Sequence, residues 1–259
     1  MKTKHIAMWT CPRSRSTAIT RAFEQIDDCI IYDEPLHHFF CFNTANYYDY
    51  INSFPSDYLL RYPDANYSSV IEKITGNLPE IKSFSFQKHM SYHLLPGFDK
   101  SWLSKVKNFL LIRNPIETIT SYWKAKKHAG FNWESSEPFV GWEEHYRLFK
   151  EIENLTQEKP LVIDSGDLVK NPQDYLKTLC CQLGVAFSEK MLYWEPNKTG
   201  ILSWNNTIFE QFSKNVINSS SFFQQSQEIN IPDILVPCIN KCMPFYEEMY
   251  KYRLIVKTS

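Results

Sequence analysis

The chain has 259 residues, a size typical of one large α/β domain with a substantial core. Charged residues make up 22% of it and the formal net charge is -1, which argues against a general nucleic-acid or membrane-surface binder. Any anion that the protein binds must therefore be held by a local cluster of donors.

The N-terminal segment predicts a strand, a loop and a helix. His5 to Thr10 is short and apolar, as expected of a buried strand. After a polar loop, apolar residues recur with helical spacing between residues 18 and 26. The loop at residues 11–17 thus joins the end of a strand to the start of a helix.

Strand candidates then alternate with helix candidates along the chain. Such alternation indicates an α/β fold of one domain, residues 1–259, with a mainly parallel sheet flanked by helices on both faces. Residues 37–80 are aromatic and punctuated by proline, and we expect them to form a helical insertion that covers the substrate. The further strand candidates are Cys29–Tyr32, Ile81–Phe86, Val106–Ile112 and Leu161–Asp164, and the further helix candidates are Ile116–Lys126 and Gln173–Leu183.

Cysteine usage and hydropathy bear on the cellular environment. Seven cysteines without a C-x-x-C pair argue against a disulfide framework or a zinc ribbon. The apolar stretch from Ile6 to Trp9 is too short for a signal peptide, and no run approaches the ~20 apolar residues of a membrane span. We therefore expect a cytoplasmic protein with reduced cysteines and no membrane span.

The loop at residues 11–17 has the composition of an anion-binding site. Backbone N–H groups at a helix N-terminus are unpaired and lie at the positive end of the helix dipole. Hydroxyl donors and two guanidinium groups add to them. The Walker pattern G-x-x-x-x-G-K-[ST] is absent, which disfavours magnesium-dependent hydrolysis of ATP or GTP. The side chains concerned are Arg13, Ser14, Arg15, Ser16 and Thr17.

A second basic element follows the fourth strand candidate. Arg113 lies at the carboxyl end of that strand, and Pro115 is suited to the first turn of a helix because its missing N–H costs nothing there. Ser121 falls about two turns along the same helix. Ligands of parallel sheets bind beyond the carboxyl ends of strands, so Arg113 and Ser121 are placed to bind a second phosphate. Taken alone, this element is more typical of a structural arginine.

Together, the two elements resemble the sulfotransferase superfamily, whose members use 3′-phosphoadenosine 5′-phosphosulfate (PAPS). In that family a P-[KR]-S-G-[ST]-T loop holds the 5′-phosphosulfate, and an R-[ND]-P strand end with a serine on the following helix holds the 3′-phosphate. Residues 12–17 resemble the first motif, and residues 113–115 with Ser121 resemble the second. The resemblance implies a P-loop-type three-layer fold, with PAPS as co-substrate bound by Arg13, Ser14, Arg15, Ser16, Thr17, Arg113 and Ser121.

The wider pattern is similar to a bacterial sulfotransferase subgroup whose plant relatives carry the name branched-chain aminotransferase-like. An aminotransferase would need a lysine Schiff base and a pyridoxal-phosphate site, and no segment suggests either. Arg15 stands where the family loop commonly has glycine. If that position needs a positive φ, the arginine costs stability. Otherwise the loop has another shape, and Arg15 is an extra sulfate ligand.

Glu34 is the first candidate for the general base that deprotonates the acceptor. Some bacterial members of the family use a glutamate after the second strand, and shielding from water would raise its pKa to suit that role. Arg13 is the candidate for stabilising charge on the leaving phosphate. Lys88 and His89 follow the third strand candidate, where relatives carry a catalytic Lys-Thr-His element. The alternative bases are Asp33, His37 and His38.

The resemblance implies in-line transfer of sulfonate from PAPS to a hydroxyl, or less readily an amine, of a small acceptor. No metal is expected to be needed, because a sulfonate bears less charge than a phosphoryl group. We expect the acceptor to bind between residues 37–67 and a mobile flap near residues 128–138. Two other functions stay open: a non-catalytic nucleotide-binding or interaction protein that keeps the fold, and another P-loop transferase. The identity of the acceptor and the oligomeric state stay open as well.

Overall fold

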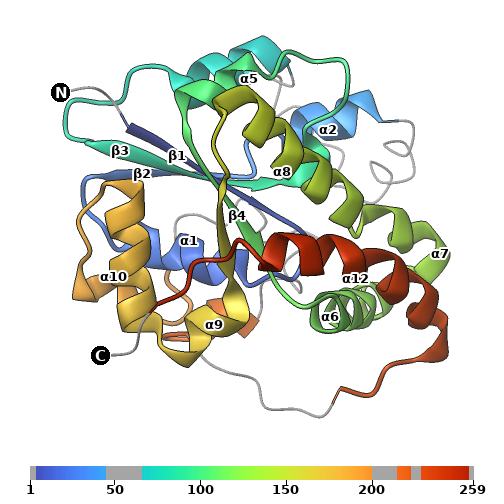
Figure 1. Ribbon diagram of the computed structural model, residues 1–259. Coiled ribbons are helices and arrows are strands. Elements are labelled where there is room, and N and C mark those ends of the chain that lie inside the picture. The colour runs from blue at the N-terminus through green and yellow to red at the C-terminus, as the bar shows by residue number, and fades with distance from the viewer. Residues whose placement is uncertain (1–3, 45–65, 200–214, 223–228, 257–259) are drawn as a thin grey trace.

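The computed structural model describes residues 4–44, 66–199, 215–222 and 229–256. Its centre is a five-stranded sheet in the order β2-β3-β1-β4-β5, in which every neighbouring pair is parallel (Figure 1). This confirms the α/β fold predicted from the alternating pattern. The strands are β1 (Lys4–Thr10), β2 (Cys29–Asp33), β3 (Phe84–Met90), β4 (Lys107–Ile112) and β5 (Leu161–Asp164).

One face of the sheet packs against a smaller helical layer. Successive side chains of a strand point to opposite faces, so Ile6 and Met8 of β1 belong to this side. They join one buried cluster with Phe23 of the first helix and Leu176 of a later one. The helices of this layer are α1 (Ser16–Glu24), α9 (Ser165–Lys170) and α10 (Pro172–Leu183), with the 3₁₀ helix η4 (Glu189–Leu192).

The other face carries a larger layer that holds many of the aromatic side chains. Trp9 of β1 lies in this cluster with Trp102 and Trp142, and none of the three is more than 2% exposed. The sheet is thus flanked by helices on both faces (Figure 1). The helices here are α2 (His37–Asn43), α5 (Tyr67–Thr75), α6 (Pro115–His128), α7 (Trp133–Ser136), α8 (Trp142–Thr156) and α12 (Val236–Tyr250), with η1 (Ser91–His93), η2 (Ser101–Lys105), η3 (Glu137–Phe139) and η5 (Asp233–Leu235).

The third strand differs from its predicted position at Ile81–Phe86. It begins at Phe84 and continues to Met90, whereas Ile81 is 80% exposed. The apolar pattern gave the wrong bounds because polar residues, Gln87 among them, are fully buried in the second half of the strand. As a result, Lys88 and His89 lie within β3 and do not follow it.

The predicted insertion and flap have partly regular structure. At the ends of the insertion, α2 and α5 are helical, and residues 45–65 lie outside the described residues. The expected mobile flap at residues 128–138 contains α7 instead. Asn132 caps this helix by accepting from the N–H of Ser135 at 3.0 Å, and buried Trp133 anchors it to the core.

Two further expectations concern membranes and thiols. Across the described ranges, helices lack the combined length and apolar character that a membrane crossing needs. All seven cysteines are free thiols, and six of them are buried.

Candidate functional site

The carboxyl ends of the strands bring the predicted site residues to one rim of the sheet. Cys11 follows β1, Glu34 follows β2 and Arg113 follows β4. The parallel register pairs Asp33 of β2 with Lys88 of β3. Since parallel strands end at the same edge, the loop after β1 shares this rim with Glu34, Lys88 and Arg113.

Residues 11–17 form the turn between β1 and α1. Arg13 and Arg15 both have positive φ, 65° and 67°, and Arg15 is the N-cap of α1. Left-handed residues in such a turn direct successive N–H groups toward one point, where they bind an anion. Ser14 Oγ is buried without a hydrogen-bond partner among the described residues, which also fits an anionic ligand. The position where the family commonly has glycine is therefore left-handed here, and an arginine in that conformation costs about 1 kcal/mol.

The two basic elements of the sequence are joined by hydrogen bonds. Arg113 donates from Nη1 to the carbonyl oxygen of Arg13 at 2.8 Å, and Arg13 donates from Nε to Ser121 Oγ at 3.0 Å. The start of α6 explains the placement of Ser121, because the Asn114 side chain caps this helix and Pro115 begins it. Segments 100 residues apart in the sequence thus form one cationic site.

Glu117 partly neutralises this site. Its Oε2 accepts from Arg113 Nε at 2.8 Å and lies 3.3 Å from Arg15 Nη2. The guanidinium groups of Arg15 and Arg113 thus share one carboxylate, and the charge of Arg113 also acts on the guanidinium of Arg13. Burial and the charge of Arg113 lower the pKa of Arg13 and Arg15 to about 10, so both stay protonated at neutral pH. Sequence analysis missed Glu117, although its i, i+4 spacing from Arg113 on a helix was a usable signal.

Ser165 is a second residue that sequence analysis missed. It begins α9 directly after β5, and its Oγ is buried without a partner among the described residues. Its carbonyl oxygen accepts from Arg15 Nη1 at 3.5 Å. The available signal was its position, because it follows the carboxyl end of a correctly predicted strand, Leu161–Asp164.

Glu34 takes part in a buried ion pair at the end of β2. It has a positive φ of 50°, and its N–H donates to the carbonyl oxygen of Lys88 at 2.8 Å. Lys88 Nζ lies 2.8 Å from Glu34 Oε1 and 3.0 Å from Asp33 Oδ1, and all three side chains are buried. Burial raises the pKa of Glu34, and the charge of Lys88 opposes this effect. Burial alone would lower the pKa of Lys88, but the two carboxylates outweigh it and raise that pKa.

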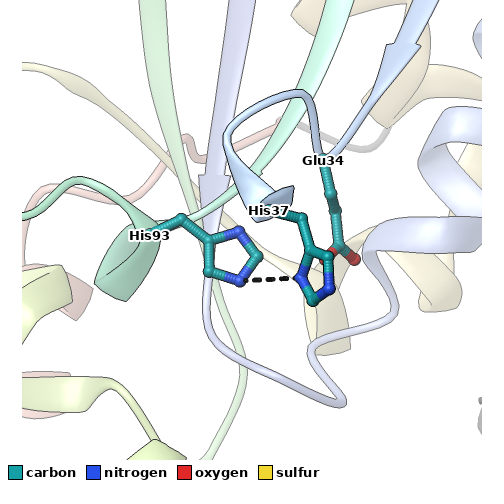
Figure 2. A group of neighbouring side chains, drawn as sticks. All are labelled: Glu34, His37 and His93. Atoms are coloured by element: carbon teal, nitrogen blue, oxygen red, sulfur yellow. Dashed lines mark hydrogen bonds between the residues drawn. The ribbon is translucent and has the colours of Figure 1, made fainter. Parts of the chain in front are cut away.

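Two histidines lie beside Glu34 (Figure 2). The N–H of His37 donates to the carbonyl oxygen of Glu34 at 2.9 Å, and His37 Nδ1 lies 3.4 Å from Nε2 of His93. Burial lowers the pKa of both imidazoles well below the ordinary value, so both are neutral at pH 7. Burial also lowers the pKa of His38, to about 4. His93 was not among the predicted site residues.

His89 does not join this group. It is fully buried, its ring stacks on Trp9 with centroids 4.4 Å apart, and its Nε2 lies 3.1 Å from Gln87 Oε1. Adjacent residues of a strand point to opposite faces, so His89 and Lys88 diverge. Burial lowers the pKa of His89 to about 3. The expectation that His89 follows the strand, next to Lys88 at the rim, is therefore wrong.

A cavity of about 290 Å³ lies next to the histidine pair. It is lined by Phe40 of α2, Tyr92 of η1 and Phe139 of η3, and the Phe40 ring lies 4.9 Å from that of His93. A larger cavity of about 920 Å³ lies between β2 and α5, and neither cavity is lined by a predicted catalytic or donor-binding residue. The smaller cavity does include Phe40 and Pro138, which belong to the two segments expected to enclose the acceptor. Since ligands of parallel sheets bind at the carboxyl ends of strands, the smaller cavity is the better candidate for the acceptor.

Comparison with curated proteins finds plant relatives. Branched-chain-amino-acid aminotransferase-like protein 2 of Arabidopsis thaliana is 29% identical over 244 residues, which cover 93% of this chain and 40% of the relative. Branched-chain-amino-acid aminotransferase-like protein 1 of the same plant is 27% identical over 217 residues, which cover 84% of this chain and 36% of the relative. This chain thus spans less than half the length of these two relatives.

Two further comparisons concern solved structures and protein families. The sulfotransferase domain from the Synechococcus PCC 7002 olefin synthase aligns over 98% of this chain and 96% of its own, with 16% identity and a TM-score of 0.48. The family described as "Sulfotransferase domain" matches residues 4–253. Because this match covers nearly the whole chain, the protein belongs to the sulfotransferase domain family, as its two basic motifs predicted.

Proposed function

We propose that the protein is a sulfotransferase that moves a sulfonate group from PAPS to a hydroxyl, or less readily an amine, of a small acceptor. The observation that carries this proposal is the pair of hydrogen bonds joining Arg13 to Arg113 and Ser121. They support one continuous site for two phosphate groups, which a nucleotide phosphorylated at both the 3′ and 5′ positions requires. Membership of the family supports the same class of reaction.

In this proposal the loop at residues 11–17 and the segment from Arg113 to Ser121 bind different phosphate groups of PAPS. The left-handed backbone at Arg13 and Arg15 directs N–H groups toward the 5′-phosphosulfate, and the unpartnered Ser14 Oγ donates to it. Two guanidinium groups, of Arg15 and Arg113, share a single carboxylate, and this arrangement favours an anionic ligand. In this proposal Arg13, Ser14, Arg15, Ser16 and Thr17 bind the 5′-phosphosulfate, and Arg113 and Ser121 bind the 3′-phosphate.

The transfer is an in-line exchange. A bond forms between the acceptor oxygen and sulfur while the bond from sulfur to the phosphate oxygen breaks, and adenosine 3′,5′-bisphosphate (PAP) leaves. Arg13 stabilises the charge that develops on the leaving oxygen. Glu34 accepts the proton of the acceptor hydroxyl, and its burial, which raises its pKa, suits this role. The positive charge comes from the arginines and Lys88, so the transfer itself requires no metal ion.

Lys88 and His89 take different roles in this scheme. Lys88 orients the Glu34 carboxylate through the 2.8 Å contact with Oε1, contacts Asp33 with a second donor and faces the sulfonate with the third. His89 stacks on Trp9 in the core and has a packing role next to the site. The acceptor occupies the cavity of about 290 Å³, in which aromatic rings, among them Phe40, favour a small and partly apolar compound.

The first experiment measures nucleotide binding and transfer separately. PAP should raise the melting temperature of the protein, and ATP with magnesium should raise it much less. Incubation with PAPS labelled in the sulfonate group and a metabolite extract should then yield a labelled acceptor. PAP binding without transfer would favour the non-catalytic nucleotide-binding protein. Equal stabilisation by both nucleotides would favour another P-loop transferase, and stabilisation by neither would overturn the assignment of the donor.

A further inference from the structure

Glu34, His37 and His93 form a compact group of metal-binding side chains. One ligand atom from each lies within 4.8 Å of the other two, and all three side chains are buried. They come from the end of β2, the first turn of α2 and the end of η1. Figure 2 shows the two imidazole rings and the carboxylate gathered at one place. No other cluster of this kind occurs in the described parts of the chain.

The spacing of the two imidazoles is that of a long hydrogen bond, and it also suits two ligands of one ion. His37 Nδ1 and His93 Nε2 are 3.4 Å apart. This is longer than the usual range of about 2.7–3.2 Å for a hydrogen bond donated by nitrogen. Two ligand nitrogens bound tetrahedrally at about 2.0–2.1 Å from one zinc ion lie about 3.3 Å apart. The pair is therefore already at the separation that a shared ion imposes.

The charge around the group favours a cation. Among the described residues, two carboxylates, of Asp33 and Glu34, pair with one ammonium, that of Lys88, which favours an added positive charge. Both imidazoles are held neutral by burial, which is the form that binds metals. Lys88 contacts Oε1 of Glu34, so Oε2 is the oxygen that would coordinate an ion, while Lys88 orients the carboxylate from outside.

A further contact fixes the orientation of His37. Its Nε2 lies 3.3 Å from Cys41 Sγ, one turn along α2. With the proton on Nε2 donated to sulfur, Nδ1 carries the lone pair on the side of His93. Supporting partners of this kind commonly set the tautomer of a metal-binding histidine.

We propose that Glu34, His37 and His93 bind one divalent ion of the zinc class and leave one coordination position open. Two imidazoles and a carboxylate form a donor set that zinc accepts, and three protein ligands with an open position are typical of its non-structural sites. Binding at this group does not depend on the proposed function. One consequence does rest on it: an ion on Glu34 occupies the general base, so zinc should inhibit sulfonate transfer and EDTA should reverse the inhibition.

The test is a titration of the full chain with Co²⁺, which replaces zinc and absorbs intensely in the visible range when tetrahedral. The protein is first treated with EDTA and carries no histidine tag. We expect one equivalent of Co²⁺ to bind with a tetrahedral spectrum, and one equivalent of Zn²⁺ to abolish that spectrum. A spectrum typical of hydrated octahedral cobalt, or none, would overturn the proposal.

Variants locate the ion. His93→Gln and His37→Gln should each weaken Co²⁺ binding by at least about 100-fold, since even the loss of a residue that only supports a ligand costs about 10–100-fold. His5→Gln is the matched control, because His5 is also buried and bonded, to Ser85, but lies at the amino end of β1. Circular dichroism checks folding, and Glu34→Gln gives an independent variant if a histidine variant unfolds. If the folded variants among His37→Gln, His93→Gln and Glu34→Gln bound Co²⁺ as tightly as His5→Gln does, the site would be contradicted.

The two proposals fail independently. If the tetrahedral cobalt spectrum appears but PAP does not bind and PAPS supports no transfer, the metal site stands and the proposed function falls. If PAPS-dependent transfer is observed and no cobalt spectrum forms, the function stands and the metal site falls.

Discussion

Arg113 donates a hydrogen bond from Nη1 to the carbonyl oxygen of Arg13 at 2.8 Å, across 100 residues of sequence. Arg13 has a positive φ of 65°, so the carbonyl group that accepts this bond belongs to the turn that directs N–H groups toward the anion. One guanidinium group therefore both supports the loop after β1 and lines the site itself. Only a side chain with several donors in a planar fork can do both.

This relationship predicts how PAP affinity changes when the guanidinium of Arg113 is replaced by a single ammonium group. Arg113→Lys should weaken PAP binding by about 10- to 100-fold, because a hydrogen bond to a charged group contributes about 1.5–3 kcal/mol and lysine cannot serve Arg13 and a phosphate together. Isothermal titration calorimetry with PAP measures the change. Arg147→Lys is the control for donor binding, since Arg147 lines the acceptor cavity and not the donor site, and pairs only with Glu143 among the ion pairs of the described residues. Equal affinities for the two variants would contradict the role of Arg113.

Much of the fold could be predicted because the decisive patterns are local. The strands at residues 4–10 and 161–164 are apolar runs bounded by polar residues, and both were placed to within one residue. Where buried residues are polar, the pattern fails, as in β3 with its fully buried Gln87. The helix α12 went unpredicted because Pro244 in its interior is typical of a helix break.

The site residues also fall into those that could be predicted from the sequence and those that could not. The anion loop and Arg113 could be predicted because each is a motif contiguous in the sequence. Glu117 and Ser165 were missed although spacing and position gave a signal for each, because their contacts with Arg15 join segments that only the folded sheet brings together. His93 had no such signal, and its contact with His37 also joins distant segments. The conformation of Arg15 was an open alternative for the same reason, and its φ of 67° decides it.

Because Arg15 has a positive φ, replacing it by glycine should affect both the free energy of unfolding and the affinity for PAP. Arg15→Gly should relieve backbone strain of about 1 kcal/mol. The ion pair that it loses with Glu117 is partly exposed and offsets at most a similar amount. We therefore expect the free energy of unfolding to be unchanged or higher, while the affinity for PAP falls because a cation is lost. Urea denaturation and calorimetry measure the two effects.

A matched control separates these two effects. Gln157 ends α8 with a positive φ of 58° and lies outside the proposed site. Gln157→Gly should stabilise the protein by a similar amount and leave PAP affinity unchanged. If Arg15→Gly kept full affinity for PAP, Arg15 would be removed from the donor site.

Glu34 is tested by removing its charge while keeping its shape. Glu34→Gln should lower the rate of transfer by about 10²- to 10⁴-fold, the usual contribution of a general base. PAP affinity should stay within about twofold, because a neutral amide oxygen still accepts from Lys88. Steady-state kinetics with labelled PAPS gives the rate, and the exposed Glu80→Gln serves as the control. A rate unchanged from that of the unaltered chain would leave Asp33 or a histidine as the base.

Buried neutral histidines should make the protein sensitive to mild acid. His145 is fully buried beside Ser91, with Nδ1 2.7 Å from the hydroxyl oxygen, and burial lowers its pKa to about 3. In the unfolded chain its pKa is about 6.5, so between about pH 6.5 and 3 the unfolded state binds one more proton than the folded state. The free energy of unfolding is therefore unaffected above pH 6.5 and falls below it, by about 1.4 kcal/mol per pH unit for this residue.

The variant His145→Gln isolates this contribution. Whatever its stability at pH 7, the slope of its unfolding free energy between pH 6 and 5 should be smaller than that of the unaltered chain by about 1.4 kcal/mol per unit. Urea denaturation at pH 7, 6 and 5 measures both slopes, and the slope is informative because a packing defect shifts stability equally at each pH. Two identical slopes would mean that His145 binds its proton equally in the folded and unfolded chains, which its complete burial argues against.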